Sequence, residues 1–259
     1  MNASTPTGFI ACDASGEMEC PFPATSPLLL ARYARIRLGE TLVDEPQASG
    51  VIHYVIEGAG QTSAASEQIE WNAGDVFVVP GGGSITHTAS DSDAVLWVVS
   101  NEPHIRFEKL QPPAQESAPT SVVHYRADEI DRQIEQLYHI GQDQETAGTA
   151  LIFSSDKQQD SRNVLPTLTL AMNSLPGGAM QRPHRHNSVA VSLVIQGEHC
   201  YSLIDGERKD WAPWATTITP PVSVHSHHND GDELAMFLIV QDGGLYYHAR
   251  AMGFKFVDD

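Results

Sequence analysis

Short runs of β-branched and aromatic residues recur along most of this chain, separated by Gly, Pro, Asn and Asp. Each run has the length of one strand, and the runs recur at intervals of roughly ten residues, as in β-sandwiches and barrels. Examples are VIHYVIEG, DVFVVPGG and AVLWVVS in the first half and VSLVIQG, CYSLIDGE and LAMFLIVQDGG in the second. The pattern predicts an all-β fold.

The two halves of the chain also repeat one pattern. Aligning Gly58 with Gly197 places Gly39 on Gly178, and an acidic Asp-x-Asp turn follows in both halves at nearly the same register. Self-similarity of this kind is typical of duplicated units. The economical interpretation is two tandem, jelly-roll-like β-barrels.

A segment rich in Pro, Gln and Ser separates the two repeats, and a helical pattern follows it. Apolar residues from Ile130 to Tyr138 recur at helical spacing, after acidic residues that are typical of a helix start. The other face of this helix is charged, so we expect the helix to pack on the outside of a β domain. We therefore predict a first barrel over residues 1–113, a linker with one short helix over 114–143, and a second barrel over 144–259.

The charge of the chain argues against some partners. Acidic side chains number 33 against 15 basic ones, which gives a formal net charge of -18 and opposes contacts with nucleic acid or an anionic membrane. The longest apolar run near the start, Pro27 to Ala31, is far shorter than a signal or membrane segment. The cysteines, Cys12, Cys20 and Cys200, have no repeated CxxC spacing and fit a reducing compartment. We expect a cytoplasmic protein whose mature form is the whole chain.

Histidine is concentrated in the second repeat. His184 and His186 flank Arg185, and His225 lies 39 residues after His186. Residues two apart on a strand share a face, so His184 and His186 are expected to point together into the barrel interior. An imidazole from a neighbouring strand would complete a triangle of nitrogen ligands for a metal. The alternative is a group of polar strand residues satisfied by hydrogen bonds.

These segments resemble the two conserved motifs of the cupin superfamily, and each half resembles one cupin barrel, as in a bicupin. The closer likeness is to the gentisate 1,2-dioxygenase group, which includes salicylate and 1-hydroxy-2-naphthoate ring-cleaving enzymes. It is carried by LPTLTLAMNSLPGGAMQRPHRH, by GEHCYSLIDGE and by the P-x-x-x-x-H-x-H-x-N arrangement from Pro220 to Asn229. The likeness covers most of residues 160–245, whereas residues 1–120 share only the general barrel pattern.

The resemblance implies that His184, His186 and His225 bind a non-haem Fe(II), with no organic cofactor. It also implies that His227 is catalytic, in contact with substrate or dioxygen; a hydrogen-bonding role behind the ligands is the alternative. Ser192 lies at an implied substrate-binding position, where the ring-cleaving enzymes carry an arginine or tyrosine.

Many cupins carry a glutamate a few residues after the second histidine, but Asn187 to Val191 contains no carboxylate. Three imidazoles leave three open positions on an octahedral metal, enough for a bidentate substrate and dioxygen. This favours a chelating 2-hydroxy carboxylate, which would seek an arginine partner. Strand alternation places Arg182 on the inward face, so Arg182 is the candidate; a surface arginine paired with a carboxylate is the alternative.

The first repeat lacks the ligand set. Glu45 and Gln47 lie where the histidine pair would fall, Ile85 or Thr86 lies where the third histidine would be, and His87 is nearby. We therefore expect the first barrel to hold no metal.

Together these features predict an Fe(II)-dependent dioxygenase that cleaves a hydroxylated aromatic carboxylate, with an aromatic acid and dioxygen as its partners. A cupin lyase, isomerase or hydrolase that uses Mn(II), Ni(II) or Zn(II) is an alternative, as is a non-enzymatic bicupin that binds a small acid. Edge strands of such barrels often pair between subunits, so fold analogy favours a homodimer or homotetramer.

Overall fold

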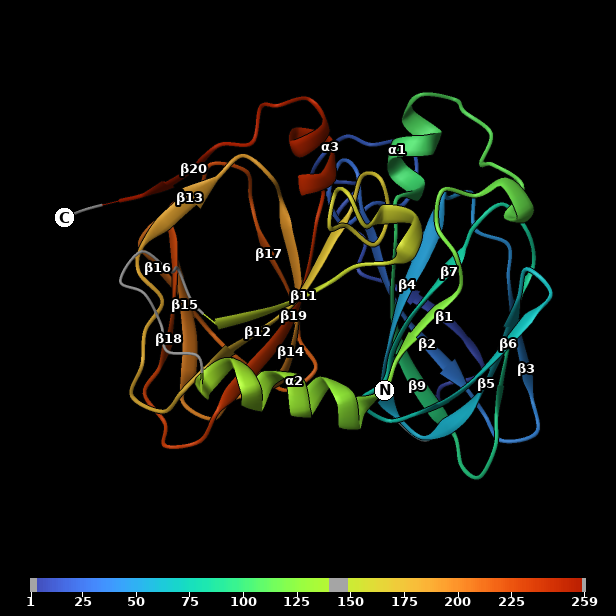
Figure 1. Ribbon diagram of the computed structural model, residues 1–259, viewed down its shortest axis with the longest axis horizontal. Helices are drawn as coiled ribbons and strands as arrows, with labels where there is room; N and C mark the ends of the chain where they lie inside the picture. Colours follow the sequence, from blue (N-terminus) through green and yellow to red (C-terminus); the bar gives the residue numbers. More distant parts are fainter. Residues whose placement is uncertain (1–3, 140–148, 258–259) are drawn as a thin grey trace. The chain divides into compact units, whose positions relative to one another are not determined.

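The computed structural model describes residues 4–139 and 149–257, which divide into two compact units. The first unit holds residues 1–130 with 155–158, and the second holds 131–154 with 159–259. Each unit consists of two antiparallel β-sheets that enclose a barrel interior (Figure 1). The predicted all-β fold of two tandem barrels is confirmed.

The first barrel has a six-stranded sheet of order β1-β2-β9-β4-β7-β10 and a four-stranded sheet of order β3-β8-β5-β6. The strands are Gly8–Ala11 (β1), Leu30–Ile36 (β2), Thr41–Asp44 (β3), Gly50–Glu57 (β4), Ala59–Ala64 (β5), Glu67–Asn72 (β6), Val76–Pro80 (β7), Ile85–Ala89 (β8), Ala94–Ser100 (β9) and Val123–Tyr125 (β10).

The second barrel has two five-stranded sheets, of order β11-β12-β19-β14-β17 and β16-β15-β18-β13-β20. The strands are Thr149–Phe153 (β11), Thr169–Leu175 (β12), His184–His186 (β13), Ala190–Gln196 (β14), Cys200–Ile204 (β15), Glu207–Asp210 (β16), Thr216–Thr219 (β17), His225–Asn229 (β18), Ala235–Gln241 (β19) and Phe254–Phe256 (β20). The helices of the chain are Glu102–Phe107 (α1), Ala127–His139 (α2) and Gly243–His248 (α3), with short 3-10 turns at Gln115–Ser117 and Asp156–Gln158.

The strand orders of the two barrels correspond strand for strand. The run β2-β9-β4-β7 matches β12-β19-β14-β17, and β3-β8-β5-β6 matches β13-β18-β15-β16. Even an irregularity is repeated, because β4 is bulged between Val55 and Glu57 and β14 between Val194 and Gln196. A bulge inserts one extra residue and is specific to its position, so its repetition gives a residue-level alignment of the barrels.

Much of the segment predicted as a linker is folded into the first unit. Strand β10 pairs with β7, and helix α2 begins directly after it. The Asp75 carboxylate accepts the backbone N–H of Ala127 at 2.8 Å and a hydrogen bond from His124 Nε2 at 2.8 Å. These contacts fix the start of the helix, which lies where the apolar spacing predicted it.

Aromatic and aliphatic side chains fill the interior of the first barrel. Trp71, Phe77, Ile85 and Leu96 belong to one core cluster, and each is at most 1% exposed. In the second barrel, a cluster of Leu175, Cys200 and Ala235 is packed against Ala179 and Trp211.

None of the described helices is long and apolar enough to cross a membrane. Cys12, Cys20 and Cys200 are free thiols, and Cys200 is buried.

Candidate metal centre

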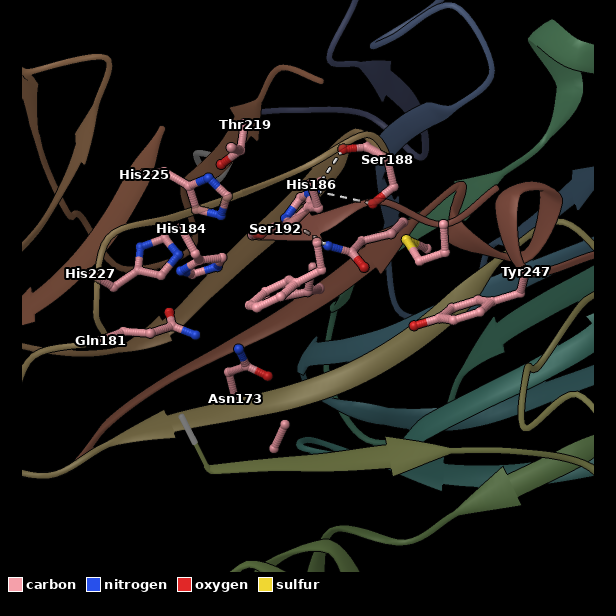
Figure 2. A pocket seen from close by; sticks show the side chains of 16 residues that line it. Asn173, Gln181, His184, His186, Ser188, Ser192, Thr219, His225, His227 and Tyr247 are labelled. Atoms are coloured by element: carbon pink, nitrogen blue, oxygen red, sulfur yellow. Dashed lines mark hydrogen bonds between the residues drawn. The ribbon is translucent and has the colours of Figure 1, made fainter. Parts of the chain in front are cut away.

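Three imidazoles of the second barrel lie together on two adjacent strands (Figure 2). His184 and His186 are the two ends of β13, and His225 begins β18, directly opposite His184 in the ladder. Their exposed fractions are 4, 8 and 3%, and one nitrogen from each lies within 4.8 Å of the others. Arg185, between the pair, is exposed, as strand alternation requires. The structure therefore brings together the three ligands expected from the sequence.

Each of these imidazoles is oriented by a hydrogen bond to a backbone carbonyl. The Nδ1 atoms contact Arg182 O at 2.7 Å (His184), Ser188 O at 2.8 Å (His186) and Ser223 O at 3.0 Å (His225). A carbonyl oxygen only accepts, so each Nδ1 carries the proton and each Nε2 keeps its lone pair. This arrangement is the usual outer support of metal-binding histidines.

The same three side chains are held in the neutral form. Burial lowers the pKa of His184 and of His186, because the charged imidazolium is poorly solvated inside the barrel. Burial and the neighbouring His184 lower the pKa of His225 to about 4. All three are thus deprotonated at neutral pH, as a metal ligand must be. The donor set fits a divalent transition metal.

The imidazoles open onto a cavity of about 260 Å³ inside the second barrel. The remaining lining is contributed by both sheets and by the segment around α3: Ala150, Asn173, Gln181, Ser188, Ala190, Ser192, Thr219, His227, Ile239, Gln241, Tyr247, Met252 and Phe254. Among these described lining residues there is no carboxylate. No acidic side chain of this lining therefore takes the place of the glutamate that is missing after the histidine pair.

His227 also lines the cavity, two residues after His225 on β18. Its Nδ1 lies 2.7 Å from Ser202 Oγ, which accepts the indole N–H of Trp211 at 2.9 Å. Burial, with the neighbouring His225 and His184, lowers the pKa of His227 well below its usual value. His227 is thus a neutral imidazole at the edge of the ligand group; its catalytic role stays a prediction.

The two predicted substrate residues lie in different environments. Ser192 lines the cavity and is 7% exposed. Arg182 is exposed, and its guanidinium lies over the ring of Phe256, 4.2 Å from the centroid. Alternation does not extend to Arg182, because β13 begins only at His184. Arg182 is outside the cavity lining, contrary to the inward orientation expected, and its role in substrate binding stays a prediction.

Sequence reasoning missed the amide side chains of the lining. Asn173 and Gln181 reach the cavity (Figure 2). Gln241 also lines it, and its Nε2 donates to His186 Nε2 at 3.2 Å. A signal existed for two of them. Asn173 and Gln241 interrupt or end strands that are otherwise largely apolar, LTLAMNSL and LAMFLIVQ, and a polar residue in such a strand indicates an interior site.

The ladder of the first barrel shows which residues stand there at the positions of the three histidines. Asp44 pairs with Ile85 as His184 pairs with His225, and two residues beyond Asp44 the chain has Pro46 in place of His186. Glu45 and Gln47 are exposed, so the expected correspondence was one residue out of register. A shift of one residue exchanges the two faces of a strand, which is why the sequence alignment selected the outward pair.

In the first barrel the Asp44 carboxylate is neutralised by an arginine. Arg32 binds it through both terminal nitrogens, at 3.2 and 2.6 Å, and both residues are buried. The position of Ser192 is taken by His53, which is fully buried and stacks on Phe77 with ring centroids 4.4 Å apart. Asp44 and Ile85 thus stand where the second barrel has His184 and His225, and the absence of a metal from the first barrel stays a prediction.

Comparison with known proteins identifies related sequences. Residues 171–241 match the Cupin domain family. Gentisate 1,2-dioxygenase of Ralstonia sp. is 34% identical over 82 residues, and 5-aminosalicylate 1,2-dioxygenase of Comamonas sp. is 35% identical over 82 residues. These matches cover 32% of this chain but only 23% and 22% of those relatives. The matched part therefore spans less than a quarter of the length of these curated relatives.

Solved structures resemble nearly the whole chain. A mutant of salicylate 1,2-dioxygenase from Pseudoaminobacter salicylatoxidans, in complex with gentisate, has a TM-score of 0.82 at 15% identity and covers 99% of this chain and 81% of its own. An oxalate decarboxylase has a TM-score of 0.60 at 15% identity and covers 91% of this chain and 73% of its own. At such identities the likeness shows a shared fold.

Proposed function

We propose that this bicupin, whose cupin domain spans residues 171–241, is a metal-dependent dioxygenase that cleaves the ring of a hydroxylated, gentisate-like aromatic carboxylate. The observation that carries the proposal is the convergence of three neutral imidazoles on one cavity of the second barrel. The curated relatives, named as 1,2-dioxygenases of gentisate, 5-aminosalicylate and 1-hydroxy-2-naphthoate, support the same reaction class. Fe(II) is the proposed metal, and no organic cofactor is required.

His184, His186 and His225 would hold the metal through Nε2, while their Nδ1–H groups stay bound to backbone carbonyls. With no carboxylate in the described lining, three imidazoles leave room for a substrate that binds through two oxygens and for dioxygen. When bound, Fe(II) supplies the redox chemistry that joins dioxygen to the substrate ring. Both oxygen atoms enter the ring-opened product, so no external reductant is consumed.

His227 is the proposed catalytic residue, because it lines the cavity beside the ligands and is neutral. Ser202 holds its Nδ1, so Nε2 is left to exchange a hydrogen bond or a proton with the substrate. The barrel wall, including Phe254 and Ile239, restricts access of bulk water to the reacting atoms.

The test is metal analysis of protein purified without oxygen, followed by oxygen-electrode traces with gentisate, salicylate and 1-hydroxy-2-naphthoate. We expect one iron per chain and one dioxygen consumed per molecule of at least one of these acids. An iron-loaded sample that consumes no oxygen with any aromatic acid overturns the proposal. Turnover with Mn(II), Ni(II) or Zn(II) and no oxygen uptake would assign the site to a lyase, isomerase or hydrolase.

A further inference from the structure

The cavity offers a ligand many hydrogen bonds but no cationic side chain. Among the described residues that line it there is no Lys and no Arg. Four imidazoles line it, those of His184, His186, His225 and His227, and the first three donate Nδ1–H to backbone carbonyls. The remaining polar groups are the carboxamides of Asn173, Gln181 and Gln241 and the hydroxyls of Ser188, Ser192, Thr219 and Tyr247.

Nearby arginines of the second unit are directed elsewhere. Arg182 is exposed and stacks on Phe256, and Arg185 is exposed. Arg208 stacks on Tyr201 and binds Asp210 at 2.7 Å. A carboxylate inside the cavity would therefore have the metal as its only positive partner among the described groups. A further charged group beyond the chelate would be desolvated without a partner, which is strongly unfavourable.

We infer that this cavity selects ligands by chelation and amide hydrogen bonds, so that its substrate class is an ortho-hydroxyaryl carbonyl compound with no charge outside the chelate. This inference rests on the proposed function and narrows it. A neutral carboxamide that presents the same two oxygens is accepted nearly as well as the acid, and an acid with a second carboxylate away from the chelate is rejected.

Gln241 is placed to recognise such a ligand. Its amide N–H donates to His186 Nε2, the nitrogen whose lone pair would bind the metal. A metal held by His186 Nε2 would take up that lone pair, so the Gln241 amide N–H would become available to a ligand. Gln241 is therefore a positioning residue for an oxygen of the chelating ligand, and its amide N–H can donate to a neutral or to a singly charged oxygen.

The test is calorimetric titration of the Zn(II)-loaded protein, which is redox-inert, with salicylate and salicylamide. The ratio of the two Kd values is divided by the same ratio for Zn(II) free in solution, so that the preference of the metal itself cancels. We expect a corrected preference for the acid of less than about 10-fold, whereas loss of a buried charge pair typically has a larger effect. A corrected preference above about 100-fold overturns the inference and leaves the proposed function intact.

A cation introduced into the cavity provides a second measurement. Ser192→Arg is expected to raise the acid-to-amide preference by about 10-fold or more, and Ser192→Gln, which adds bulk without charge, is expected to leave it unchanged. Thr219→Lys repeats the test from a neighbouring strand if Ser192→Arg does not fold. An unchanged ratio in the charged variants would mean that a cation already serves the ligand, and the inference would fall. If neither compound binds the wild-type protein, the inference fails, while oxygen uptake separately decides the proposed function.

Discussion

The two barrels share one strand order, yet the first is filled by its own side chains and the second encloses a cavity. The difference lies in a few inward positions. Asp44 and Ile85 stand where the second barrel has His184 and His225, and the bulky His53 stands where it has Ser192. A small residue at the last position leaves room for a ligand, whereas an imidazole stacked on Phe77 closes the space. The same arrangement of strands can thus surround either a hydrophobic core or a ligand-binding cavity, and the side chains that point inward decide which of the two forms.

One polar arrangement is common to both barrels. Trp71 Nε1 donates to Thr62 Oγ1, which lies 2.8 Å from His87 Nδ1, just as Trp211 and Ser202 support His227. In the first barrel this arrangement supports His87, which is 1% exposed and packs against His53 with ring centroids 5.2 Å apart. The hydrogen bonds that hold His227 are therefore a feature shared by both barrels, and His227 differs from His87 in that it lines the cavity.

The largest effect is expected from removing one metal ligand. His225→Ala leaves two imidazoles, so we expect the metal content to fall from stoichiometric to near zero, beyond the roughly 10–100-fold effect of losing an outer partner. Ile85→Ala alters the equivalent position of the first barrel and serves as the matched control. It should retain the metal while losing about 2–5 kcal/mol of stability through a cavity. Elemental analysis and urea unfolding measure both; full metal content in His225→Ala would contradict the ligand assignment.

Variants of the Arg32–Asp44 ion pair test whether the interior of the first barrel serves stability and not metal binding. Arg32→Met leaves the buried Asp44 carboxylate unpaired, which should lower the free energy of unfolding by about 3–5 kcal/mol without changing metal content. The double variant Arg32→Met/Asp44→Leu removes both charges and should recover most of that loss. Urea unfolding followed by fluorescence gives the values, and a single variant as stable as the wild type would show that the pair is dispensable.

Stability of the metal-free protein should fall in acid. Burial lowers the pKa of His87 and of His225 to about 4, whereas the pKa of a histidine in the unfolded chain is about 6.5. Between these two pH values the imidazole is protonated in the unfolded chain but not in the folded chain. Each such imidazole therefore lowers the free energy of unfolding by about 1.4 kcal/mol for each unit that the pH falls. Above pH ~6.5 this contribution is constant.

Urea unfolding at several pH values measures this slope. Zn(II) should steepen this slope and extend it below about pH 4, because a bound metal keeps the ligand imidazoles of the folded chain unprotonated, and His87→Gln should reduce the part of the slope that arises from the first barrel. A slope unaffected by both changes would contradict the assignment of neutral buried imidazoles.

The smallest effect concerns the shared Trp–hydroxyl–His arrangement. Thr62→Val leaves the buried Trp71 Nε1 and His87 Nδ1 without their partner, which should lower stability by roughly 1–3 kcal/mol and leave turnover unchanged. Ser202→Ala should lower turnover by about 10-fold, because His227 loses its orienting contact. Steady-state oxygen uptake and thermal unfolding of both variants distinguish the roles; equal turnover in the two would remove His227 from the mechanism.

Several features of this protein were predictable from local sequence. Strand alternation placed His184 and His186 on one face, and the resemblance to the cupin motifs added His225, which lies on the neighbouring strand. The helix over Ala127–His139 followed from its apolar period. The amides at Asn173, Gln181 and Gln241 were not predicted, because single polar residues in separate strands converge only after both sheets are assembled.

The sequence by itself determined the duplicated barrels and the shared face of His184 and His186, since repetition and a period of two are local properties of the chain. Only the tertiary structure decided that Asp44, not Glu45, faces the first interior, because the choice depends on the register with β8. It also decided that Arg182 lies outside the cavity, because the residue precedes the start of β13 and its guanidinium packs on Phe256 of β20. Whether a barrel interior is filled or contains a cavity depends on the total volume of the side chains that distant strands place there. No single segment of the sequence determines that total volume.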